Sequence, residues 1–215
     1  MGSFIPMTTA QTNEKWKRLD EDVARGDEDR WLSSRYAAIE ARKRLIALYA
    51  FNLELARIRL AVTEPGLGAI RFEWWREAVA ELEKGKDPRR HDAIEAVAET
   101  AIAVKTLLGL VDGHQAAFDT GDAELEPEVL LMRAAAGQLT LAHGWGPHIA
   151  DLAPAYARAR RGVSEVTGPV LPKVPAPIRP AICHAVLRFD YATGRRPGPL
   201  AKRITLVRAM LQGRA

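Results

Sequence analysis

The chain has 215 residues, of which 47% are hydrophobic and 27% are charged, a balance typical of a globular protein. No apolar run approaches the roughly 20 residues of a membrane-spanning helix, and the first residues lack a basic segment followed by an apolar core. We therefore predict neither a membrane-spanning helix nor a signal peptide, and the single cysteine, Cys183, excludes an intrachain disulfide. We expect a cytoplasmic protein, peripheral to the inner membrane, or a mitochondrial-matrix protein if the source is eukaryotic.

The net charge of +4 is divided unevenly along the chain. Residues 155–215 contain twelve Lys and Arg but two acids, a net of +10, whereas residues 1–154 carry a net of −6. A basic third suits an anionic partner such as lipid headgroups or a diphosphate, although a solvated arginine-rich surface would have the same composition. No motif of a nucleic-acid-binding fold is present, so we expect no nucleic acid among the partners.

Apolar residues recur at helical spacing through most of the chain, and no alternating strand pattern of useful length is present. Asn13 can cap the first helix, and Pro127 suits the first turn of a later one. We expect a helix end and a turn over residues 111–122, and a helix stop at GWGP (144–147). The helical segments expected in chain order are residues 13–24, 27–39, 42–62, 69–84, 91–110, 127–143, 151–166, 181–193 and 200–211.

These segments predict an all-α fold with one domain of about eight helices over residues 13–215, preceded by a flexible N-terminus of residues 1–12. The segment PVLPKVPAPIRP (169–180) contains five prolines and can form neither a helix nor an inner strand. It would be either a domain boundary or a long loop packed across helix ends. We prefer the loop, because only about 35 residues follow it.

Motifs of common catalytic and metal sites are absent from the sequence. There is no GxGxxG, no nucleotide-binding P-loop, no HExxH and no CxxC. The five histidines form no ligand cluster, since His143 and His148 are five residues apart rather than the four that would aim both at one metal. Local motifs therefore assign no metal ligand and no catalytic residue.

The segment ALYAFNLELARIRLAV (47–62) is nearly all apolar, yet polar side chains interrupt it. On a helical wheel Asn52, Ala56 and Arg59 share one side, and Tyr49 flanks them. A helix this apolar is expected to be packed on most of its faces, so its polar groups must be paired or must line a wet cavity. Both interpretations stay open from the wheel: internal pairs, or the polar mouth of a cavity.

Three more charged residues are candidates to support such a mouth. Glu54 and Arg57 lie on another side of the same helix, three residues apart, where they can pair. Arg71 is placed on the apolar face of the next helix, near its beginning, where the helix dipole does not favour a cation. We expect Arg71 to point inward and therefore to need an anion, either a carboxylate or a bound phosphate.

Two stretches resemble the squalene/phytoene synthase family. The run DRWLSSRYAAIEARKRLIALYAFNLELARIRLAVTEPGLGAIRFEWWREAV (29–79) carries most of the resemblance, and MRAAAGQLTLAHG (132–144) is similar to the alanine-glycine helix of that family. Leu171-Pro172 falls where the family has a leucine-proline segment. The resemblance implies an all-α isoprenoid-synthase fold around a central apolar cavity, whose active members hold Mg²⁺ and a prenyl diphosphate on two facing aspartate-rich helical motifs.

The chain departs from the family at these motifs. Aligning Tyr49-Ala50-Phe51 with the family places the first motif on Ala56, Arg57 and Leu60, none of which is a carboxylate. The second motif should lie between Asp151 and Pro172, where the two acids, Asp151 and Glu165, are not i,i+4 partners. The resemblance is closer to a degenerate branch of the family, which includes an assembly factor of mitochondrial respiratory complex I.

Three hypotheses follow. The first is a catalytically degenerate member that binds a lipid or prenyl chain or assembles a membrane complex, with no cofactor. The second is an active head-to-head prenyltransferase, which would use Mg²⁺ or hold diphosphate on its arginines. The third is an unrelated helical interaction protein. The candidate ligand-binding residues at the cavity mouth are Tyr49, Asn52, Ala56 and Arg59, with Glu54, Arg57 and Arg71 as polar supports.

Overall fold

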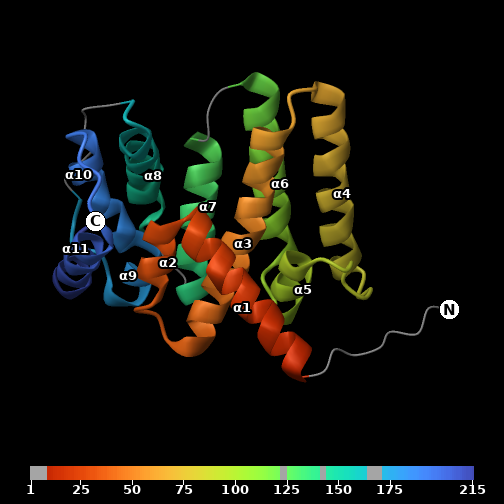
Figure 1. The fold of residues 1–215 in the computed structure, drawn as a ribbon, viewed down its shortest axis with the longest axis horizontal. Coiled ribbons are helices and arrows are strands. Elements are labelled where there is room, and N and C mark those ends of the chain that lie inside the picture. The colour runs from red at the N-terminus through yellow and green to blue at the C-terminus, as the bar shows by residue number, and fades with distance from the viewer. Residues whose placement is uncertain (1–8, 122–124, 141–143, 164–170) are drawn as a thin grey trace.

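A computed structural model describes residues 9–121, 125–140, 144–163 and 171–215. These residues form helices and no strand, which confirms the all-α prediction (Figure 1). Among them, no helix is both long and apolar enough to cross a membrane. The helices are α1 Thr9–Gly26, α2 Glu28–Ser34, α3 Ile39–Ala61, α4 Pro65–Glu83, α5 Asp92–Glu99, α6 Val104–Thr120, α7 Leu125–Leu139, α8 Gly146–Arg161, α9 Arg179–Ile182, α10 Arg188–Ala192 and α11 Pro199–Gln212, with 3-10 turns at Ala176–Ile178 and Cys183–Leu187.

Helix α3 is the centre of the bundle. Every residue from Leu45 to Phe51 is buried, and α3 contacts α1, α2, α4, α5, α6 and α7. The continuous apolar run explains this position, because a helix without a polar side must be covered on all sides. The C-terminal half of α3 is less covered, and its polar residues lie there.

Helix α4 packs mainly on α6 and makes fewer contacts with α3 (Figure 1). Its buried stripe consists of Gly68, Phe72, Trp75 and Val79, at the spacing of one helix face. The aromatic ring of Phe118 on α6 occupies the space beside Gly68, where a Cβ atom would lie 2.2 Å from it. The absence of a side chain at Gly68 therefore permits the close approach of α4 and α6.

Several expected boundaries were wrong. Helix α1 begins at Thr9, so residues 9–12 of the expected flexible N-terminus are helical, while residues 1–8 lie outside the described part. The expected helix 91–110 is two helices, because the backbone turns at Ala101, whose φ is +51°, and α6 then continues to Thr120. GWGP opens a helix instead of stopping one, since Pro147 occupies the first turn of α8. The expected helix 181–193 is broken into α9, a 3-10 turn and α10.

The described part of the proline-rich segment packs against the end of α11, as expected, but the prediction that it forms no helix was wrong, because Ala176–Ile178 form a 3-10 turn and α9 begins at Arg179. Val174 is buried, and its N–H donates to the carbonyl of Gly213 at 2.8 Å. Arg179 donates from Nε to the carbonyl of Val174 at 3.0 Å and from Nη1 to that of Met210 at 2.7 Å. These bonds hold the C-terminal helix against the bundle.

The contact at Gly68 gives a stability prediction. Gly68→Ala should lower the free energy of unfolding by about 2 kcal/mol, because the new methyl group overlaps the Phe118 ring and forces α4 from α6. Urea unfolding followed by circular dichroism measures this. Gly66→Ala, in the same turn but with no atom within 4 Å of the added Cβ, should be neutral or slightly stabilising. Equal effects of the two substitutions would contradict the packing interpretation.

Candidate functional site

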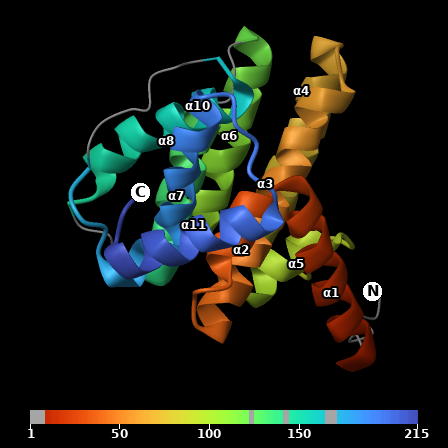
Figure 2. The ribbon, with the colours of Figure 1, turned by 60° about the vertical axis from the view of Figure 1, so that its left-hand side comes forward.

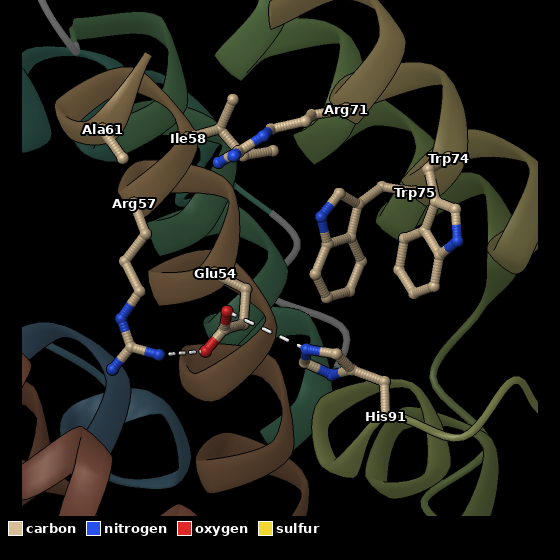
Figure 3. A pocket seen from close by; sticks show the side chains of 8 residues that line it. All are labelled: Glu54, Arg57, Ile58, Ala61, Arg71, Trp74, Trp75 and His91. Carbon is tan, nitrogen blue, oxygen red and sulfur yellow. Dashed lines mark hydrogen bonds and ion pairs between the residues drawn. The ribbon is translucent and has the colours of Figure 1, made fainter. Parts of the chain in front are cut away.

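Two pockets flank the C-terminal half of α3. The first, here called the arginine pocket, has a volume of about 330 Å³ and lies between α3, α6, the α1–α2 turn, the start of α7 and the end of α8. The residues that line it are Gly26, Asp27, Arg30, Asn52, Leu53, Ala56, Arg59, Leu60, His114, Pro127, Glu128, Ala157, Arg160 and Arg161. The second, here called the tryptophan groove, has a volume of about 370 Å³ and lies between α3, α4 and the start of α5. Its lining is Glu54, Arg57, Ile58, Ala61, Arg71, Trp74, Trp75 and His91 (Figure 3).

The arginine pocket brings together three of the seven candidate residues, Asn52, Ala56 and Arg59. Tyr49 is not in its lining. The ring is 1% exposed, and burial, together with the charge of Asp27, raises the pKa of its hydroxyl despite the opposing charge of Arg30. Among the described residues its hydroxyl has no hydrogen-bond partner, so Tyr49 is a buried group beside the pocket rather than part of its wall.

Glu54, Arg57 and Arg71 lie in the tryptophan groove and do not support the arginine pocket. Glu54 and Arg57 form the expected ion pair, and Nε2 of His91 lies 3.9 Å from the Glu54 carboxylate (Figure 3). The inward orientation expected for Arg71 was wrong, because its side chain is exposed. Arg71 lies at the edge of the buried stripe of α4. Because α4 packs mainly on α6, this edge is not covered by α3, and the side chain extends into the groove towards α3 (Figure 3).

A buried charge network forms one wall of the arginine pocket. Asp27 caps the N-terminus of α2 and pairs with Arg30 in the first turn. Arg30 also pairs with Glu128 of α7, and Arg160 of α8 donates from Nη1 to Asp27 Oδ1 at 3.1 Å. Burial would raise the pKa of the Asp27 carboxyl, but the charges of Arg160 and Arg30 outweigh it and hold that pKa well below its usual range. Asp27 is therefore ionised at any physiological pH.

A second group of polar side chains lies behind this wall. The carboxylate of Asp29 accepts hydrogen bonds from the hydroxyls of Tyr156 at 2.8 Å and Tyr191 at 2.6 Å. Lys202 of α11 lies 2.8 Å from its other oxygen. His184 packs edge-on against the Tyr156 ring, with centroids 5.0 Å apart, and is fully buried. These contacts join α2, α8, α10 and α11 behind the pocket.

The wall formed by α6 contributes a neutral histidine. Nε2 of His114 lies 2.9 Å from Oδ1 of Asn52, which can only accept, so His114 donates through Nε2–H. Burial, with a further contribution from the charge of Arg59, lowers the pKa of His114 to about 3. The polar side of α3 therefore has an internal hydrogen-bond partner and also borders a pocket. Both interpretations of the helical wheel, an internal pair and a cavity wall, apply to it.

Sequence reasoning missed the residues that complete the pocket. Asp27 and Arg30 fall at the beginning of the segment 27–39 that is expected to be helical, and His114 falls in the segment 111–122 that is expected to contain a helix end and a turn. Their partners Glu128 and Arg160 are 98 and 133 residues away along the chain. No local sequence pattern predicts pairs so distant in the chain. Aspartate is a preferred N-cap residue, so the sequence could have predicted the position of Asp27 at the beginning of a helix, but not its partners.

The donor set of the arginine pocket does not fit Mg²⁺. Its two carboxylates, Asp27 and Glu128, are both engaged by Arg30. Where the two aspartate motifs of a synthase would face each other, α3 presents Ala56 and Leu60, and α8 presents Arg160 and other non-acidic residues. Within the described ranges no three His, Cys, Asp or Glu are grouped to hold a metal; Asp151 is exposed on α8, and Glu165 lies outside these ranges. Four arginines against two acids give the lining of the pocket an excess of positive charge.

Comparisons with known proteins agree with the family resemblance of the sequence. The model of a family described as squalene/phytoene synthase matches residues 23–131, about half of the chain. The chain is 29% identical over 102 residues to "NADH dehydrogenase (ubiquinone) complex I, assembly factor 6" from Bos taurus and from Homo sapiens, and 28% identical to that from Mus musculus. The match covers 46% of this chain and 31% of each relative, so the chain spans about a third of their length. No solved structure matches the chain.

The buried histidines give a pH prediction. Burial, ahead of nearby arginine charges, lowers the pKa of both His114 and His184 to about 3, against about 6.5 in an unfolded chain. Between these values the unfolded state binds more protons, so the free energy of unfolding should fall as the pH falls from about 6.5 towards 4. Each histidine contributes a slope of up to about 1.4 kcal/mol per pH unit.

Urea titrations at pH 7, 6, 5 and 4 measure this slope, and His114→Gln should make it shallower, because the amide can donate to Asn52 without titrating. A free energy of unfolding that stays constant from pH 6.5 to 4 would contradict the neutral burial of both rings.

Proposed function

The chain belongs to the squalene/phytoene synthase family, and from this premise we propose that it is a catalytically degenerate member that serves as an assembly factor of a membrane complex. It retains the mouth of the synthase pocket as a site for an anionic lipid, such as a prenyl chain with a diphosphate headgroup. One observation carries the proposal: in the arginine pocket, Ala56 and Leu60 on α3 face Arg160 on α8 where a synthase needs metal-binding carboxylates.

The pocket lacks the carboxylates of a synthase at Ala56 and Leu60 and has arginines elsewhere in its lining, so its electrostatic character is the opposite of a synthase's. A synthase collects Mg²⁺, and the metal then holds the diphosphate that departs as the allylic cation forms. In this pocket guanidinium groups such as those of Arg59 and Arg161 can bind phosphate oxygens directly, with two parallel hydrogen bonds per contact. Such binding holds the headgroup but supplies no metal to draw off a leaving group, which favours retention over turnover.

The assembly role rests on the relatives. Their name assigns them to the assembly of NADH dehydrogenase (ubiquinone) complex I, and the shared 102 residues cover less than a third of their chains. The third hypothesis, a helical protein outside the family, is wrong, because the family match covers about half of the chain. The second, an active prenyltransferase, has in its favour the family and a pocket that suits a diphosphate, and it remains the alternative.

Genetics tests the assembly role. Removing the gene from its source organism should lower the amount of fully assembled NADH dehydrogenase complex, since an assembly factor is needed at a step before the finished complex. Native gel electrophoresis with an in-gel NADH activity stain measures this, and the wild-type gene should restore the complex. An unchanged amount of complex after gene removal would contradict the proposal.

Biochemistry tests the pocket. The purified protein with farnesyl or geranylgeranyl diphosphate and Mg²⁺ should yield no coupled C30 or C40 product by mass spectrometry, but it should bind farnesyl diphosphate without Mg²⁺. Arg59→Gln should weaken this binding about tenfold, the effect of losing one charge-assisted hydrogen bond.

The matched control is Arg57→Gln, which removes the same charge two residues away on the side of α3 that lines the tryptophan groove. It should leave the affinity unchanged. A coupled product would establish the prenyltransferase alternative, and equal losses from both substitutions would move the site out of the arginine pocket.

A further inference from the structure

Helix α11 carries an apolar stripe on its exposed side. Leu200, Ile204, Val207 and Leu211 are 72%, 47%, 41% and 74% exposed. Their spacing of four, three and four residues places them on one narrow face of a helix. Large apolar side chains are normally scattered singly over a protein surface, so four in one line on a single helix indicate a surface that contacts something.

The opposite side of α11 is fixed to the bundle, so the stripe cannot turn inward. On this opposite side, Leu206, Ala209 and Met210 are buried against the bundle. Lys202 pairs with Glu28 at 2.6 Å and with Asp29 at 2.8 Å. At its C-terminal end Arg179 holds the carbonyl of Met210. Figure 2 shows the helix crossing the outside of the bundle.

Basic residues flank the stripe on both edges. Arg203 and Arg208 are exposed, and on a helical wheel they lie to either side of the line formed by Ile204 and Val207. The sequence of α11, PLAKRITLVRAMLQ, contains no acid. An apolar line between arginines is the pattern of a helix that lies in the headgroup layer of an anionic bilayer, with apolar side chains among the acyl chains and cations at the phosphates.

We propose that the exposed face of α11 docks the protein on an anionic bilayer surface. Charge decides between this occupant and a second copy of the chain. A symmetric pairing of two α11 stripes would set Arg203 and Arg208 of one copy beside those of the other, without an acid on either helix to neutralise them. A lipid surface supplies the missing negative charge.

The molecule offers a comparison on the opposite side of the bundle. Leu67 and Ile70 of α4 are 51% and 67% exposed, so this face is also apolar. Its neighbours on the helix surface include the exposed acids Glu73 and Glu77, which pair with Arg76 and Arg89 and so offer anionic headgroups no excess of positive charge. Both faces thus expose large apolar side chains, two on α4 and four on α11, but they differ in charge, so α4 serves as an internal control for the charge.

The experiment is cosedimentation of the full chain with two kinds of vesicle. One contains phosphatidylcholine alone, and the other also contains about one third phosphatidylglycerol, which gives it an anionic surface. Wild type should bind the anionic vesicles and lose binding as salt rises, because headgroup attraction is screened. Ile204→Asp with Leu211→Asp should lower the partition coefficient at least about tenfold, as should Arg203→Gln with Arg208→Gln.

Ile70→Asp should bind as wild type does. All positions are exposed, and far-ultraviolet circular dichroism verifies that the variants fold. Equal vesicle binding by the wild type and the α11 variants would overturn the proposal. A wild-type dimer that Ile204→Asp dissociates would also overturn it, because the stripe would then be the interface with a second copy of the chain. The proposal extends the proposed membrane role, but vesicle binding and prenyl diphosphate binding use different variants and can fail separately.

Discussion

The carboxylate of Asp27 is buried at the turn between α1 and α2, where it accepts hydrogen bonds from Arg30 and Arg160. Through Arg30 the same network reaches Glu128. One buried anion and its arginines therefore fix the positions of α2, α7 and α8 around the polar side of α3. Removing one partner from a buried ion pair costs about 3–5 kcal/mol, because the remaining charge is left without compensation. The shape of the arginine pocket depends on this network.

The network also limits the chemistry of the pocket. Asp27 and Glu128 are the carboxylates in its lining, and the arginines that hold the fold together already engage them. A divalent cation would have to displace buried arginines to use them as ligands. The same groups that stabilise the bundle thus favour an anionic ligand over a metal.

Helix α3 separates two environments of different character. On one side, Asn52 and Arg59 border the arginine pocket, which has buried charges in its wall. On the other side, Glu54 and Arg57 border the tryptophan groove. Trp75 of this groove packs on Phe51, with ring centroids 5.3 Å apart. A third surface, the stripe of α11, lies across the outside of the bundle. Lys202 links it to the interior, because this residue pairs with Asp29 behind the arginine pocket. The stripe of α11 and the wall behind the arginine pocket are therefore joined through this ion pair.

The sequence by itself determined the all-α class, the central position of α3, the family, and the absence of carboxylates at Ala56, Arg57 and Leu60. These features depend on residues close in the chain, where periodicity and residue type carry the information. It also separated Asn52 and Arg59 from Glu54 and Arg57, because a helix turns by about 100° per residue.

Tertiary structure alone decided what those sides face. His114 meets Asn52 across 62 residues, and Arg160 meets Asp27 across 133, because the packing of whole helices sets these distances. Arg71 shows what a helical wheel does not predict. The wheel placed this residue on the apolar face, but α4 packs mainly on α6, and the edge that carries Arg71 borders the open tryptophan groove. A wheel gives the direction of a side chain relative to its own helix, and only the packing of the neighbouring helices decides whether that direction is buried.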